Sequence, residues 1–266
     1  MAPDALRLER LDNGIALLTL NRPAALNALS DDMVAGLGRL LDELATDGAT
    51  RVLVMTGAGR GFCAGFDLGE AALAPDEDEL GRATAWTARQ ERFSGLITKL
   101  RALRQPVIAA VNGLANGGGL ALALGAEIRY AAASARFNAA FVKVGMTGCD
   151  MGVSWLLPRS VGLSRSFEML LTGRMVDAQE AERIGLVSAT VPDGELLSRA
   201  LATAREIAAH DPFAMWMTKR GGWANAEAPS LAQAIELENR SQILARTTGG
   251  LQRAAEALVA RKRNKA

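Results

Sequence analysis

Two apolar runs of strand-like composition each lead into a glycine-rich turn, and this pairing constrains the fold more than any other feature. The run 51–54 enters the turn 55–68, and the run 106–111 enters the turn 112–120, which contains the glycine triplet 117–119. Because glycine has no Cβ, the backbone N–H groups of such turns can approach a ligand closely. Two such turns side by side could direct two N–H donors at one developing oxyanion. The pattern indicates a catalytic device built from backbone.

The segments around these turns predict alternating strands and helices. A hairpin is expected at the start, with strands 5–10 and 15–20 joined by the turn signal Asp12-Asn13-Gly14. Ser30 is expected to cap a helix that ends near Ala45. Further predicted elements are a mostly helical stretch at 76–104, a short apolar helix after the glycine triplet, strands at 127–133 and 186–191, a helix end at Gly173 and a helix cap at Asp177. This alternation predicts a parallel-rich α/β core with crossover helices.

The pattern changes near Gly194. Beyond it, the sequence predicts only helices, near 195–210, 212–223, 231–246 and 251–262. We therefore divide the chain into an α/β core, 1–194, and a C-terminal helical region, 195–266, which is expected to serve packing or subunit assembly.

Composition excludes several classes of protein. With 49% hydrophobic and 22% charged residues, the chain is globular. Its net charge of +1 argues against nucleic-acid binding, which needs a concentrated basic face. Cys63 and Cys149 are too few for a disulfide framework or a zinc site. The start lacks a signal-peptide core, and no apolar run reaches the roughly 18 residues of a membrane span. We expect a cytoplasmic protein with no membrane partner, metal or redox cofactor.

Several segments, in a consistent order, carry the motifs of a known family. They are 21–29 (Asn-Arg-Pro-Ala-Ala-Leu-Asn-Ala-Leu), 62–68 (Phe-Cys-Ala-Gly-Phe-Asp-Leu), 106–113 (Pro-Val-Ile-Ala-Ala-Val-Asn-Gly) and the triplet 117–119. The match continues through 171–173, 181–187 and the basic C-terminus, so it covers nearly the whole chain. In these segments the chain resembles the crotonase superfamily, the enoyl-CoA hydratase/isomerase family.

The resemblance implies a fold, an assembly and a ligand. The fold would be a spiral of ββα units that forms two nearly perpendicular sheets, followed by a C-terminal helical trimerisation region. The assembly would be a homotrimer, or a homohexamer made of two trimers. The substrate would be an acyl-CoA thioester, with no further cofactor.

The resemblance also implies site residues. The backbone N–H groups of Phe66 and Gly118 would form the oxyanion hole. The path of the CoA nucleotide and pantetheine would be lined by Ala25, Leu26, Ala64, Asp67 and Leu68. Arg261, in the basic C-terminus, could reach the CoA phosphate of a neighbouring subunit.

Two positions depart from the family pattern. Hydratases of this family activate one water between two glutamates, and the resemblance places these at Ala121 and at Phe141. Neither side chain can accept a proton or orient water. Phe141 is instead expected to line the acyl pocket. Asp150 lies near the position where some isomerases and dehalogenases of the family carry a catalytic aspartate; it could also simply cap the following helix, expected from Met151.

Three functions remain open at this point. The first is an acyl-CoA lyase or isomerase with enolate chemistry, in which one-carboxylate isomerisation is favoured over standard hydration. The second is a CoA-thioester dehalogenase or hydrolase, with Asp150 as an attacking nucleophile in the dehalogenase case. The third is a non-catalytic acyl-CoA-binding homologue.

Overall fold

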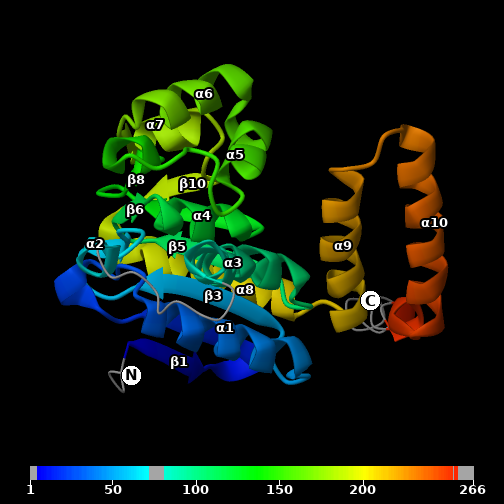
Figure 1. Cartoon of the computed structure of the whole chain (residues 1–266). Helices are drawn as coiled ribbons and strands as arrows, with labels where there is room; N and C mark the ends of the chain where they lie inside the picture. The colour runs from blue at the N-terminus through cyan, green and yellow to red at the C-terminus, as the bar shows by residue number, and fades with distance from the viewer. Residues whose placement is uncertain (1–4, 72–80, 254, 257–266) are drawn as a thin grey trace.

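The computed structural model describes residues 5–71, 81–253 and 255–256, and contains two β-sheets surrounded by helices (Figure 1). The larger sheet has the strand order β1-β2-β3-β5-β7-β10. Its edge strands β1 (Leu6–Arg10) and β2 (Ile15–Leu20) pair antiparallel, which confirms the predicted hairpin. The other neighbours pair parallel, namely β2 with β3 (Val52–Gly57), β3 with β5 (Val107–Val111), β5 with β7 (Ile128–Ala132) and β7 with β10 (Ala189–Val191).

The smaller sheet consists of very short strands in the order β4-β6-β8-β9. They are β4 (Gly61–Cys63), β6 (Leu114–Asn116), β8 (Arg136–Asn138) and β9 (Val176–Asp177), the last of which is antiparallel to β8. The chain thus passes from the large sheet to the small one three times, through the pairs β3–β4, β5–β6 and β7–β8. This repeated passage confirms the expected spiral of ββα units.

Helices cover both faces of the large sheet. On one face lie α1 (Asp31–Thr46), α3 (Arg82–Ala102) and α4 (Gly118–Gly125), and on the other lies α8 (Leu196–Ala208). Alternate residues of β3 point to opposite faces of the sheet. Leu53 belongs to the hydrophobic core under α1, α3 and α4, whereas Val54 belongs to the core under α8. Burial on both faces explains why these strands read as continuous apolar runs.

The predicted helix signals act where expected. The Ser30 side chain accepts a hydrogen bond from the Met33 N–H at the start of α1, at 3.2 Å. Asp177 caps α7 (Ala178–Arg183) through the Glu180 N–H, and Gly173 ends α6 (Leu163–Thr172) in a left-handed conformation. The remaining described elements are α2 (Leu68–Ala71), α5 (Val153–Val161) and the short 3₁₀ helices η1 (Asp12–Gly14), η2 (Pro23–Ala25), η3 (Ala140–Val144) and η4 (Asp193–Glu195).

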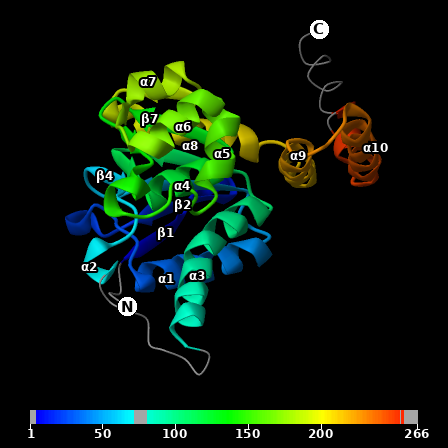
Figure 2. The ribbon, with the colours of Figure 1, turned by 45° about the horizontal axis from the view of Figure 1, so that its top comes forward.

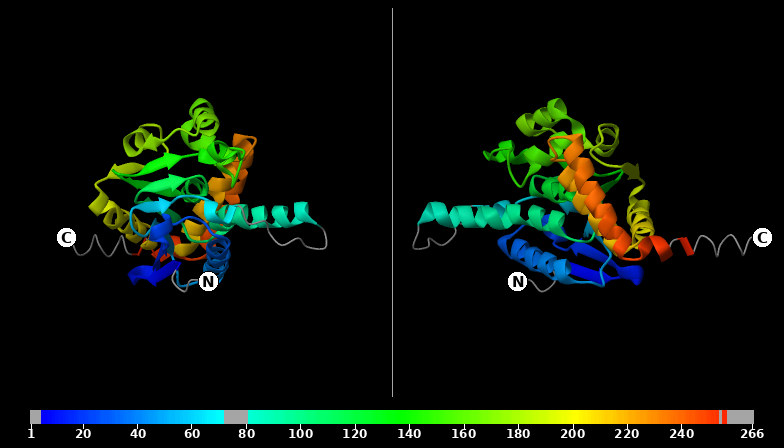
Figure 3. Two further views of the ribbon diagram at one scale, coloured as in Figure 1. Left: turned by 60° about the vertical axis from the view of Figure 1, so that its left-hand side comes forward. Right: turned by 90° about the vertical axis from the view of Figure 1, so that its right-hand side faces the viewer.

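Two predicted element boundaries differ from those in the structure. The strand predicted at 186–191 is confined to β10, because the N–H groups of Leu186 and Val187 donate to the Ala181 carbonyl at the end of α7. The helical stretch predicted from residue 76 begins at Arg82 within the described part, and residues 76–80 lie outside it. From there α3 runs past α1 and extends beyond the body of the core (Figures 2 and 3).

The C-terminal helices α9 (Pro212–Asn225) and α10 (Leu231–Thr247) stand to one side of the core as a pair (Figures 1 and 2). One buried amine joins this pair to the core. Lys219 of α9 donates to the carbonyls of Leu100 and Gln105, both at 2.9 Å, and forms an ion pair with Glu127 at 3.2 Å. Of the helix predicted at 251–262, residues 251–253 and 255–256 are helical, and the remainder lies outside the described residues.

Within the described ranges, no helix combines the length and the apolar character that crossing a membrane requires.

Candidate active site

The two glycine-rich turns meet at Gly65 and Gly118. Gly65 has a φ of +87°, and a Cβ placed on it would lie 2.6 Å from the Asn116 carbonyl oxygen and 3.2 Å from the Gly118 amide nitrogen. Only glycine fits this conformation and this contact. The approach brings Phe66 and Gly118 to the wall of one cavity, with a volume of about 400 Å³.

The N–H groups of Phe66 and Gly118 are available to a ligand. The backbone hydrogen bonds that flank Phe66 run from the Leu29 N–H to the Gly65 carbonyl and from the Asp67 N–H to the Leu29 carbonyl, at 2.7 and 3.0 Å. They leave out the Phe66 N–H. Gly118 is the first residue of α4, so its N–H has no acceptor within the helix. Among the described residues, no protein group accepts a hydrogen bond from either N–H.

The cysteine beside this turn is a packing residue in the structure. Cys63 is fully buried in β4, and burial raises the pKa of its thiol to about 12, although a hydrogen bond from the Gly65 N–H acts in the opposite direction. The thiol therefore stays protonated near neutral pH and is a poor nucleophile.

The residues predicted to bind CoA lie near the cavity, but not all on its wall. Ala64 and Leu68 line it. Ala25 and Leu26 lie in and just after η2, which is held against this turn by a 2.9 Å hydrogen bond from the Ala64 N–H to the Leu26 carbonyl. Asp67 forms an ion pair with Arg22 at 2.9 Å. Arg261 lies outside the described residues.

The two positions at which the resemblance implies glutamates differ in their surroundings. Ala121 is fully buried within α4 and does not reach the cavity wall. Phe141 does line the cavity, as expected, and its ring edge lies 3.5 Å from the place of a Cβ on Gly117. The cavity has an aromatic wall where the resemblance would place a carboxylate.

Asp150 is the acidic residue on this wall. Its Oδ1 accepts two hydrogen bonds, from the Gln90 side-chain amide at 2.5 Å and from the Met151 N–H at 2.7 Å. The following helix, α5, begins at Val153 with Gly152 as its N-cap, so the interpretation of Asp150 as a cap of a helix from Met151 is wrong. The carboxylate is instead held at the side of the cavity by residues from two segments.

Helix α3 supplies cavity residues, among them Arg89, Gln90 and Phe93, that the sequence analysis did not single out. Trp86, Arg89, Gln90 and Phe93 line the cavity and follow an i, i+3, i+4, i+7 spacing, which places them on one helix face. The buried Arg89 forms an ion pair with Asp31 at 2.6 Å, and its guanidinium lies 5.1 Å from the centre of the Phe66 ring. This spacing, within a stretch predicted to be helical, is the sequence signal that could have indicated a shared helix face.

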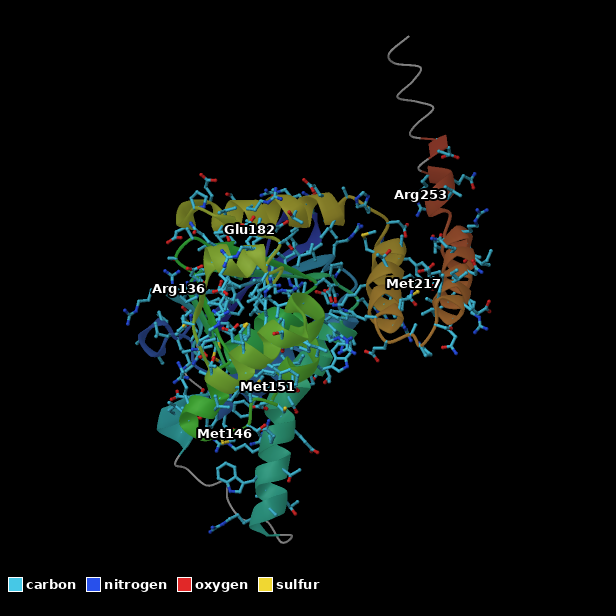
Figure 4. All side chains as sticks on the ribbon, turned by 90° about the horizontal axis from the view of Figure 1, so that it is seen from above. Arg136, Met146, Met151, Glu182, Met217 and Arg253 are labelled. Carbon is cyan, nitrogen blue, oxygen red and sulfur yellow. The ribbon has the colours of Figure 1, made fainter. Side chains whose placement is uncertain are left out.

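The opposite wall comes from η3 and the segment that connects it to α5. Met146 and Met151 lie along this segment, on the side of the core from which α3 extends (Figure 4), and both line the cavity with the α3 residues. Met151 is buried, and its sulfur lies 3.1 Å from the place of a Cβ on Gly118. A larger hollow of about 980 Å³ between α3, α5 and α9 is lined by none of the predicted site residues.

Comparison with known proteins decides the family. The family described as enoyl-CoA hydratase/isomerase matches residues 10–260, which is most of the chain. The protein belongs to the enoyl-CoA hydratase/isomerase family.

Individual members of the enoyl-CoA hydratase/isomerase family match over most of their length. The Mycobacterium tuberculosis (strain ATCC 25618 / H37Rv) protein named probable enoyl-CoA hydratase EchA12 is 46% identical over 232 residues, which are 87% of this chain and 81% of that protein. The 1,2-epoxyphenylacetyl-CoA isomerase of Escherichia coli (strain K12) is 38% identical over 256 residues, 96% of this chain and 95% of that one. A solved structure of a monofunctional enoyl-CoA isomerase from M. smegmatis is 43% identical, has a TM-score of 0.74 and covers 87% of this chain and 98% of its own.

Membership in this family confirms the prediction of an acyl-CoA enzyme of the enoyl-CoA hydratase/isomerase type.

Proposed function

We propose that this enzyme moves a carbon–carbon double bond within the acyl group of an acyl-CoA thioester. In this proposal the N–H groups of Phe66 and Gly118 hold the thioester oxygen, and Asp150 carries the proton. The observation that supports it most is that Asp150 is the one carboxylate among the described residues that line the cavity.

The proposed oxyanion hole acts on the enolate. When a proton leaves the acyl group, negative charge moves to the thioester oxygen, and preorganised N–H donors stabilise it. Each such donor is typically worth about 3 kcal/mol of transition-state stabilisation. The N-terminus of α4 adds the positive end of its dipole at Gly118.

A single carboxylate suits isomerisation. Asp150 takes a proton from the α-carbon of a 3-enoyl thioester, and the electron pair of that C–H bond forms the dienolate. The protonated Asp150 then returns the proton to the γ-carbon, the 2,3 double bond forms, and the thioester carbonyl is restored. Hydration by the two-glutamate route needs a second carboxylate to orient water, and Ala121 and Phe141 cannot supply one.

The E. coli and M. smegmatis relatives agree with an isomerase by name, whereas the M. tuberculosis relative is named a probable hydratase. The E. coli relative, which is 38% identical, is named for an epoxyphenylacetyl-CoA substrate rather than for a simple 3-enoyl chain.

The CoA portion is proposed to lie along Ala25, Leu26, Ala64, Asp67 and Leu68, with Arg261 reaching the phosphate of CoA bound to a neighbouring subunit. The proximity of η2 to the Ala64 turn supports this path.

We further propose that α9 and α10 serve assembly into a homotrimer or a homohexamer. In the described chain α10 buries none of its residues, and it leaves Leu231, Ile243 and Leu244 between 52% and 76% exposed. Large exposed apolar side chains on a helix that stands to one side of the core are typical of an interaction surface.

The experiment compares two reactions in the wild type and in Asp150→Asn. With trans-3-hexenoyl-CoA the wild type is expected to form the 2-enoyl isomer, and Asp150→Asn is expected to lose about 100-fold or more of kcat. Glu91→Gln is the matched control, because Glu91 is a neighbouring acid on α3 that does not line this cavity, and it should behave as wild type. Robust water addition to crotonyl-CoA without isomerisation would contradict the proposal.

The same variants separate the two alternatives. A covalent aspartyl adduct at Asp150, trapped and detected by mass spectrometry with a 4-halobenzoyl-CoA probe, would favour the dehalogenase. Tight binding of acyl-CoA without turnover, unchanged in Asp150→Asn, would favour a non-catalytic binder.

A further inference from the structure

The two oxygens of the Asp150 carboxylate are in different environments. Oδ1 accepts both hydrogen bonds, from the Gln90 amide and from the Met151 N–H. No group of the described residues donates to Oδ2. Two donors on one oxygen stop the carboxylate from rotating, so Oδ2 is the oxygen with lone pairs free to take a proton.

The Gln90 donor comes from a fixed part of α3. Its neighbour Arg89 is 4% exposed and is tied to Asp31 at the start of α1, and Phe93, one turn later, is buried. Gln90 itself is exposed toward the cavity that it lines with Asp150. The backbone that carries Gln90 is therefore fixed, and the exposed side chain reaches from it to Asp150 Oδ1.

The Met151 donor depends on an unusual backbone turn. Met151 has a φ of +45° and Gly152 a φ of +75°, so two consecutive residues after Asp150 are left-handed. A left-handed non-glycine residue costs about 1–2 kcal/mol and is retained where the surroundings enforce it. Here the buried Met151 side chain enforces it, because it packs against Gly118. The same turn that places the Met151 N–H on Oδ1 thus connects Asp150 to the proposed oxyanion hole.

The chemistry of Gln90 also matches a holding role. A glutamine amide donates hydrogen bonds but carries no charge and does not titrate, so it neither neutralises the carboxylate nor competes for its proton. The cationic residues on the cavity wall are Arg89 and Lys143. Arg89 forms an ion pair with Asp31, lies over the rings of Phe66 and Trp86, and donates a hydrogen bond to the Glu70 carbonyl.

We propose that Gln90 is a positioning residue that fixes Asp150 Oδ1, so that Oδ2 faces the acyl carbon that loses and regains the proton. This proposal rests on the proposed role of Asp150. It assigns Gln90 a part in turnover through Asp150 and not in binding of the CoA thioester.

The test uses Gln90→Met, which keeps the length of the side chain and removes its donors. With trans-3-hexenoyl-CoA, kcat is expected to fall about 10- to 100-fold, because a catalytic group displaced by about 1 Å can lose about 100-fold in rate. KM should change less than about threefold. Thr87→Met is the matched control, since Thr87 is an exposed residue one turn earlier on α3 that does not line the cavity, and it should retain the wild-type kcat.

A double-mutant cycle ties the effect to Asp150. In the Asp150→Asn background, Gln90→Met is expected to cause no further loss of kcat, because both changes act on one group. A second readout needs no complete turnover: exchange of the α-protons of butyryl-CoA for deuterium in D₂O, which should slow in Gln90→Met by the same factor as kcat.

The outcomes separate the two levels of the proposal. If Asp150→Asn loses activity but Gln90→Met retains the wild-type kcat and exchange rate, the role of Gln90 is overturned and the proposed function stands. If Gln90→Met raises KM and leaves kcat unchanged, Gln90 contacts substrate and the positioning role is overturned. If Asp150→Asn retains both activities, the proposed function itself fails. Equal melting temperatures of the variants and the wild type would show that the losses do not come from unfolding.

Discussion

Gly65 and Gly118 are in backbone contact: a Cβ added to Gly65 would lie 3.2 Å from the amide nitrogen of Gly118. One glycine-rich turn therefore sets the position of the other. The proposed oxyanion hole depends on this contact, because its two donors come from the residue after Gly65 and from Gly118 itself.

Gly65→Ala should abolish most of the activity, because the methyl group would push the turn at Asn116 away from Phe66. Gly162→Ala is a matched control, since Gly162 has a similar φ of +82° and nothing within 4 Å of a Cβ, compared with +87° at Gly65. Gly162→Ala should lose about 1–3 kcal/mol of unfolding free energy from the positive φ alone, and Gly65→Ala should lose more, because its Cβ would also lie 2.6 Å from the Asn116 carbonyl oxygen. Only Gly65→Ala should lose about 100-fold or more of kcat/KM, the equivalent of one oxyanion donor. Equal activity of the two variants would contradict the proposed oxyanion hole.

The two cysteines should react very differently with an alkylating reagent. Cys149 is exposed, whereas Cys63 is buried and burial raises its pKa to about 12. Iodoacetamide at pH 8 should therefore label Cys149 in the folded protein and Cys63 only in denaturant. Peptide mass spectrometry measures both sites in one sample. Rapid labelling of Cys63 in the native state would show that the β4 segment opens readily.

Lys219→Met should weaken the attachment of α9 and α10 to the core. The Lys219 amine is buried, and its removal leaves the carbonyls of Leu100 and Gln105 without their donor. We expect a loss of about 3 kcal/mol of unfolding free energy, measured by chemical denaturation. Lys99→Met is the control, because Lys99 pairs with Asp42 at the surface, at 2.6 Å, and should cost less than about 1 kcal/mol.

Asp47 should make stability depend on pH in the acidic range. Hydrogen bonds from the Thr50 hydroxyl, Arg10 and the Ala49 N–H hold the pKa of this carboxyl well below its ordinary value. A carboxyl whose pKa is lower in the folded state than in the unfolded state stabilises the fold above the unfolded pKa, about 3.9, and this contribution is lost as the pH falls below it. The melting temperature of the wild type should therefore exceed that of Asp47→Asn at pH 7, and the difference should shrink as the pH is lowered toward 3. A constant difference would show that Asp47 acts by its shape alone.

Structural features that depend on residues within one segment could be predicted from the sequence. Ser30, Gly173 and Asp177 act on backbone groups a few residues away, so their roles follow from local chemistry, and the apolar runs of β3 and β5 are long enough to show burial on both faces. The strands of the small sheet escaped prediction. β4, β6 and β8 have three residues each, too few for a period, and they are strands only because distant segments pair with them.

The site follows the same division. The two glycine-rich turns predicted a pair of backbone donors and the family resemblance implied Phe66 and Gly118, whereas the hydrogen-bond partner of Asp150 did not follow from the sequence. Gln90 lies 60 residues before Asp150, and the hydrogen bond between them depends on how α3 crosses the core. The helix start at Val153 likewise depends on the left-handed Met151, a conformation that no local preference of methionine indicates.

Helix α3 connects the cavity to the C-terminal helices. Its first half forms one wall of the candidate site's cavity, and the Leu100 carbonyl in its last turn accepts a hydrogen bond from the Lys219 amine of α9. If α9 and α10 join subunits as proposed, the assembly also fixes the C-terminal end of the helix that carries Gln90, and the formation of the oligomer would then help to align the proposed proton carrier, Asp150.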